Sequence, residues 1–151
     1  MSKAFSPSCL QAVEHSIASS EQQHTGEIQF AVESSLALNA LLAKQTPRER
    51  ALEVFSHLRV WDTELNNGVL VYVLLADHAI EIVADRGIHR AVGPQAWQAL
   101  CEAVQSEFAK RHYTEGCQLA IQAITHLLVQ HFPCQQGGGP NELPNTPVVL
   151  G

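Results

Sequence analysis

Alternating apolar and polar positions along the chain predict three β-strands. Apolar residues occupy every second position of 28–32, which is the period of a strand with one covered face. The run 69–75 is apolar throughout and is bounded by turn residues, as is typical of a central strand covered on both faces. Alternation returns at 80–84 after a short polar turn. This third strand follows too closely for a helical crossover, so the pattern predicts an antiparallel hairpin.

Apolar residues at helical spacing predict four helices around these strands. The clearest start lies at Thr46, Pro47 and Glu49, which combine an N-cap hydroxyl, a first-turn proline and the acid of a capping box. That helix is expected to end near Arg59. The other amphipathic segments lie at 5–20, from 93 onwards and from 114 onwards.

The order of these elements predicts an α/β fold. One βαβ unit followed by a hairpin, with helices left for both faces, gives a three-layer α/β/α sandwich around a small mixed sheet. Residues 1–133 are expected to form a single domain. From 134 to 151 the chain is rich in glycine and proline, which is typical of a tail. Apolar residues in this tail would let it dock onto another protein or onto its own sheet.

Composition and charge limit which partners the protein can bind and which cell compartment it is expected in. Fifteen acidic and nine basic residues give a formal net charge of −6, which repels a phosphate backbone and argues against nucleic acid as a partner. The longest apolar run, 69–76, is too short to span a bilayer, and no export signal is evident. We therefore expect a cytoplasmic protein without a transmembrane segment, and peripheral membrane association stays open. The cysteines form no CxxC pair, which is typical of free thiols.

Acidic and amide side chains are expected at one edge of the sheet. If the first two strands are parallel, Glu27 and Asn67 lie at the same edge, and Asp85 returns to it at the end of the third strand. Asp62 and Glu64 approach this edge just before the second strand. Carboxylate and amide oxygens suit a hard cation, so these five residues predict a calcium or magnesium site. Three further polar residues approach the same edge: His24, Asn66 and His89.

Two other interpretations of these residues stay open. Asp and Asn at strand ends also serve turn geometry alone. Alternatively, the protein is a metal-dependent phosphatase, in which Glu27 and Asp85 hold the cation, Arg86 binds the phosphate by a bidentate contact, and a metal-bound water attacks. The sequence contains neither a GxSxG nucleophile elbow nor a phosphate-binding glycine loop. It therefore leaves open whether the protein is an enzyme.

Several segments resemble the TPM domain family. The segment 49–88 contains an NNGVL strand entry at 66–70 and a D-x-G-I turn at 85–88, which are similar to those of bacterial members. The segment HTGEIQFAVE at 24–33 resembles the first strand of the family, and NELP at 141–144 resembles an element near its C-terminal end. The likeness spans about 20–147 and implies an α/β/α sandwich.

The resemblance also carries expectations about function. A plant thylakoid-lumen relative is described as an acid phosphatase, and some relatives bind calcium at acidic positions near strand ends. Carried over to this chain, the matching positions are Glu27, Asn67 and Asp85, with Asp62 and Glu64 in the variable approach to the second strand. The acid cluster and the missing nucleophile motif favour a non-enzymatic, or at most weakly enzymatic, module that binds a divalent cation and a protein partner. The alternative is a weak metal-dependent acid phosphatase.

Overall fold

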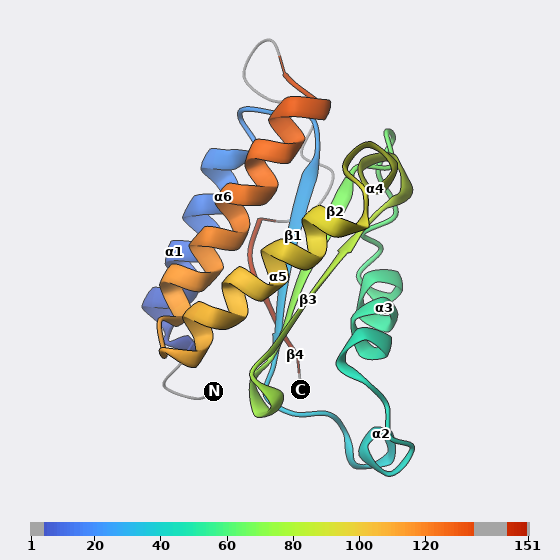
Figure 1. Ribbon diagram of the computed structural model, residues 1–151, viewed down its shortest axis with the longest axis vertical. Coiled ribbons are helices and arrows are strands. Elements are labelled where there is room, and N and C mark those ends of the chain that lie inside the picture. The colour runs from blue at the N-terminus through green and yellow to red at the C-terminus, as the bar shows by residue number, and fades with distance from the viewer. Residues whose placement is uncertain (1–4, 135–144, 151) are drawn as a thin grey trace.

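The computed structural model describes residues 5–134 and 145–150, which form a four-stranded sheet with helices on both faces (Figure 1). The strands are β1 (Glu27–Glu33), β2 (Gly68–Leu74), β3 (Ala79–Ala84) and β4 (Val148–Leu150). The helices are α1 (Pro7–Ser20), α2 (Leu38–Leu42), α3 (Pro47–His57), α4 (Arg86–Val92), α5 (Pro94–Ala109) and α6 (Tyr113–His131).

The strands lie in the order β3-β2-β1-β4. β1 is parallel to β2 and to β4, whereas β2 and β3 form an antiparallel hairpin. Val69 of β2 is the common register partner of Ile28 and of Ala84, so the three longer strands are aligned across the sheet. The βαβ unit and the hairpin expected from the sequence are therefore confirmed.

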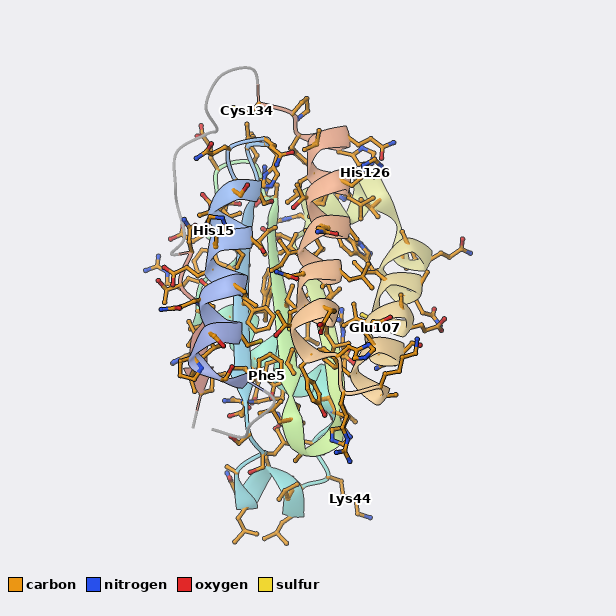
Figure 2. All side chains as sticks on the ribbon, turned by 90° about the vertical axis from the view of Figure 1, so that its left-hand side faces the viewer. Phe5, His15, Lys44, Glu107, His126 and Cys134 are labelled. Carbon is orange, nitrogen blue, oxygen red and sulfur yellow. The ribbon has the colours of Figure 1, made fainter. Side chains whose placement is uncertain are left out.

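Each face of the sheet has its own hydrophobic core, because side chains alternate along each strand. Phe30, Val71 and Ile82 pack in one core beneath α1, α5 and α6. Ala31 and Tyr72 pack in the other, beneath α3. Figure 2 shows α1 and α6 side by side over the sheet, with Phe5 near one end of the pair. These layers confirm the three-layer α/β/α sandwich.

The α3 start follows the sequence closely. The Thr46 hydroxyl accepts a hydrogen bond from the Glu49 N–H at 3.1 Å, and Glu49 Oε1 accepts one from the Thr46 N–H at 2.9 Å. This reciprocal pair is the expected capping box. The last long helix, α6, begins two residues earlier than expected, because its N-cap is His112 rather than Thr114.

Three short elements were not expected from the sequence. α2 and α4 are five and seven residues long, and such short helices carry little periodic signal. β4 has only three residues and forms because its backbone pairs with β1. The C-terminal segment thus docks onto its own sheet at 148–150, one of the two possibilities considered for the tail. The tail residues 135–144 lie outside the described residues. Among the helices that the structure describes, none has the length and apolar character needed to cross a membrane.

Candidate functional site

The starts of β1 and β2 and the end of β3 lie at one edge of the sheet. The Glu27 N–H donates to the Asn67 carbonyl oxygen at 3.4 Å, and the Asp85 N–H donates to the Gly68 carbonyl oxygen at 2.9 Å. The structure therefore brings the backbones of Glu27, Asn67 and Asp85 to a common edge. We call this the strand-end edge.

The side chains at the strand-end edge point in different directions. Ile28 faces the core beneath α1 and α6, so alternation sends Glu27 to the opposite face. Asn67 instead turns towards the end of α6, because its amide donates to Thr25 Oγ1 at 3.3 Å and Thr25 hydrogen-bonds to the Phe132 carbonyl oxygen. The backbones of these residues therefore meet at one edge, but the side chains of Glu27 and Asn67 point in different directions.

Glu27 has a carboxyl neighbour that the sequence did not point to, Glu21. Burial raises the pKa of Glu21 well above its usual range, and a side-chain hydrogen bond to Glu27 and the charge of Glu27 raise it further. Glu27 itself is almost fully buried. Two carboxyl groups in this setting share a proton at neutral pH. A cation at this position would have to displace that proton.

Asp85 sits where the strand-end edge meets α4. Its Oδ1 accepts from the Arg86 N–H at 2.8 Å and caps the helix. Its Oδ2 is buried and has no hydrogen-bond partner among the described residues. Two backbone oxygens lie close to Gly87, two residues further on, where an added Cβ would come within 2.5 Å of the Asn66 oxygen and 2.6 Å of the Leu65 oxygen. The Asn66 oxygen accepts the Gly87 and Ile88 N–H groups. This corner is therefore rich in oxygen atoms.

Asp62 and Glu64 lie on the exposed loop that leads to β2. Asp62 forms an ion pair with Arg59 at 2.9 Å, and both side chains are more than half exposed. Glu64 and His89 are exposed as well. Across residues 5–134 and 145–150, no three His, Cys, Asp or Glu side chains come together as a metal-binding group. A cation at the strand-end edge would therefore depend on amide and backbone oxygens beside Asp85.

His24 is buried in a hydrogen-bond chain that ties α1 to α6. The Gly26 N–H donates to His24 Nδ1 at 3.1 Å, so Nε2 carries the ring proton and donates to Ser20 Oγ at 2.9 Å. Ser20 in turn hydrogen-bonds to Thr125, whose hydroxyl donates to the Ile121 carbonyl oxygen. Burial lowers the pKa of His24 to about 4. Because Nε2 is already protonated, this Ser–His pair holds the fold and does not activate a nucleophile.

A family model for the TPM domain matches residues 1–127. The chain belongs to the TPM domain family. Its structure is similar to the NMR structure of the BA42 protein from the psychrophilic bacterium Bizionia argentinensis, with 28% identity and a TM-score of 0.82 over 96% of this chain and 94% of that one. It also shares the fold of an N-terminal domain of a protein from P. gingivalis, with 15% identity and a TM-score of 0.68 over 89% and 84% of the two chains. No curated protein matches the sequence significantly.

In this TPM domain a second polar cluster lies at the other end of β1. Arg50 Nε and Nη2 donate to the two Glu33 oxygens at 2.9 and 3.1 Å, and the Tyr72 hydroxyl donates to Glu33 Oε1 at 2.6 Å. Burial alone would raise the pKa of Glu33, but these hydrogen bonds outweigh it and lower the pKa. A cavity of about 460 Å³ adjoins the cluster between α2 and α3. Nothing in the sequence spacing connects these three residues, so sequence reasoning missed them.

Proposed function

We propose that this TPM domain is a non-enzymatic module that binds a divalent cation, calcium or magnesium, at the strand-end edge and engages a protein partner. The observation that carries the proposal is Asp85 Oδ2, a buried carboxylate oxygen without a hydrogen-bond partner among the described residues. Buried polar atoms in native proteins are rarely left unsatisfied. The Leu65 carbonyl oxygen, which lies beside Gly87 at the start of α4, is of the type that calcium prefers.

Of the remaining predicted ligands, Glu27 and Asn67 share the strand-end edge with Asp85 through their backbones. The Asn67 Oδ1 atom is also buried without a partner among the described residues. Asp62 and Glu64 lie on the same loop as Leu65 and would contribute at its solvent side. The cytoplasmic location expected from the sequence remains part of the proposal, and it is supported by Cys9, Cys101 and Cys117, which form no disulfide.

Calorimetric titration with calcium and with magnesium tests the cation site. The informative variant is Asp85→Asn, because asparagine still caps α4 while the charge is lost. Asp77→Asn is the matched control, since it removes the same charge from the exposed β2–β3 hairpin. We expect wild type and the control to bind, and Asp85→Asn to bind at least about tenfold more weakly. Absence of heat and of any shift in Tm with either ion would rule out the cation site.

The weak metal-dependent phosphatase is the second candidate. Arg86 favours it, because this exposed guanidinium follows Asp85 directly at the same corner. In that case a cation held by Asp85 and Glu27 would activate water, and Arg86 would hold the phosphate. Hydrolysis of an aryl phosphate that requires the metal and falls with Arg86→Gln would support the enzyme. Metal binding without hydrolysis would support the non-enzymatic module.

A further inference from the structure

A groove of about 390 Å³ runs along the outer edge of β3, between α5 and the start of α3. β3 residues form its floor, Arg48 stands on the α3 side, and the α5 wall extends from Pro94 to Gln105. At 1.5 Å per residue this wall is about 16 Å long, the length of an extended segment of about five residues. Figure 1 shows α5 and α3 on either side of β3.

The floor of the groove presents backbone hydrogen-bonding groups. The Asp85 N–H donates to the Gly68 oxygen of the β2 side. Along an antiparallel ladder, every second residue of a strand hydrogen-bonds to its neighbour strand. Ala79, Glu81 and Val83 therefore also bond to β2, and the backbone N–H and C=O groups of the residues between them point away from the sheet. These outward residues are Ile80, Ile82 and Ala84, and all three line the groove.

The outward backbone groups of the central residue, Ile82, already hydrogen-bond to two side chains. Arg48 Nη1 donates to the Ile82 oxygen at 2.7 Å, and the Ile82 N–H hydrogen-bonds to the Cys101 thiol. The Arg48 side chain is half exposed, and sulfur is a weak acceptor. A peptide N–H and C=O would make better-aligned hydrogen bonds at the same two positions.

We propose that this groove binds an extended, basic segment of a partner protein, which adds to β3 as a further strand. The charge favours a basic segment, because two carboxylates, Glu81 and Glu102, line the groove against one guanidinium, Arg48, which pairs with Glu81 at 3.7 Å, and the whole chain carries −6. The sheet already accepts a short strand in this way, since the three residues of β4 pair with β1 at the opposite side. The proposal specifies the protein-interaction part of the proposed function and is independent of the cation site.

The shape of the groove favours a lone segment over a second copy of this chain. β3 is recessed between α3 and α5, which both pack against it. The β3 of a second copy is recessed in the same way, so the two pairs of helices would collide before the strands could pair. A segment without flanking helices meets no such obstacle.

The probe is a set of synthetic eight-residue peptides of alternating valine and threonine, flanked either by lysines or by glutamates. Binding to the 15N-labelled protein is followed by NMR, in a buffer that contains a chelator so that the cation site plays no part. We expect the amide signals of Ile80, Ile82 and Ala84 to move. The indole N–H of Trp97 should move with them, because Trp97 lines the groove and this N–H has no partner among the described residues. Trp61, which donates to the Ser56 oxygen elsewhere, is the control within the same spectrum.

A modified peptide and a protein variant distinguish strand addition to β3 from binding of the peptide in any other way. Methylation of alternate peptide nitrogens removes the N–H groups that would bond to β3 and should abolish binding. Arg48→Met frees the Ile82 oxygen and leaves two acidic side chains facing the peptide, so the lysine peptide should bind about fivefold more tightly. Arg59→Met is the matched control, because this exposed arginine contacts Asp62 and Trp61 and does not line the groove.

Three outcomes would overturn the proposal. The first is equal binding by the methylated and unmethylated peptides. The second is movement of the groove signals with protein concentration alone, which would indicate a second copy. The third is no movement of these signals with any peptide up to about 1 mM, the range in which weak peptide recognition is still detected.

Discussion

Glu33 is a charged side chain buried in the sheet, and its neighbours determine whether it stabilises the fold. Arg50 holds it by two hydrogen bonds and Tyr72 by a third. Burying a carboxylate is costly unless its oxygens are satisfied, so each partner should contribute measurably to stability.

Removing these partners should give two different losses of unfolding free energy. Tyr72→Phe leaves the ion pair intact and should cost about 1.5–3 kcal/mol, the range for a hydrogen bond to a charged group. Arg50→Met leaves Glu33 buried without its cation and should cost about 3 kcal/mol or more. Urea unfolding at pH 7 measures both, with Arg59→Met as an exposed control. An Arg50→Met loss no larger than that of the control would contradict the buried ion pair.

At the scale of elements, three helices end in a way that costs stability. Lys44, Arg59 and Arg111 follow α2, α3 and α5 with positive φ angles of 58°, 56° and 64°. Glycine adopts this left-handed conformation without the steric penalty of a Cβ. Figure 2 shows Lys44 projecting near α2, beyond the end of the sheet.

Arg111→Gly should therefore stabilise the protein. We expect a gain of about 0.5–1 kcal/mol, because the exposed Arg111 side chain has little packing to lose and the strain at φ 64° is relieved. Arg90→Gly is the matched control. The same substitution inside α4 should destabilise by about 1 kcal/mol. Thermal unfolding followed by circular dichroism compares the two, and equal signs would contradict the role of the left-handed position.

The close contact where β2 begins predicts a strong effect of a single methyl group. A Cβ added at Gly68 would lie 2.2 Å from the Val60 carbonyl oxygen. This oxygen belongs to the backbone, so a side-chain rearrangement cannot make room for it. We expect Gly68→Ala to cost about 3 kcal/mol, the upper range for overpacking, as measured by urea unfolding. A loss below about 0.5 kcal/mol would show that the loop before β2 moves easily.

The elements that the sequence predicted were those with a local signal. The capping box at Thr46 and the alternation of β1 need no distant partner to be recognised. The three residues of β4 form a strand only because β1 leaves an edge beside them, and α4 begins only because Asp85 caps it. Tertiary contacts decide such short elements, so the local pattern does not contain them.

The same distinction applies to the candidate site. Strand direction places Glu27, Asn67 and Asp85 at one edge, and topology alone predicts this. The Glu21–Glu27 pair depends on how the chain turns after α1. No periodic pattern fixes that turn, nor the direction in which Asn67 turns towards Thr25. Sequence reasoning therefore found the edge but not the side-chain contacts within it.

At the scale of the whole molecule, the buried His24 and the half-buried Glu21 have opposite effects on how stability depends on pH. The pKa of His24 is lowered from 6.5 to about 4, so the unfolded chain binds more protons between these values and stability rises with pH there. The pKa of Glu21 is raised from 4.5, so its contribution is full below pH 4.5 and is lost as pH rises towards the folded pKa. Between pH 4.5 and 6.5 the two effects largely cancel.

Above pH 6.5 His24 no longer titrates in either state, so of these two groups only Glu21 acts. The free energy of unfolding should then fall by up to about 1.4 kcal/mol per pH unit. Glu21→Gln should remove this decline, because the amide still donates to Glu27 and does not titrate. In His24→Gln the opposing effect of His24 is gone, so stability should fall with rising pH from pH 4.5 upwards. His126→Gln, at an exposed position of α6, is the control and should leave the pH profile unchanged.

Urea unfolding at pH 5 to 8.5 in the presence of a chelator measures these profiles. A Glu21→Gln profile that falls as steeply as that of the wild type would show that Glu21 is ionised in the folded protein. In that case the Glu21–Glu27 pair would not hold a proton, and a cation at the strand-end edge would meet two ionised carboxylates.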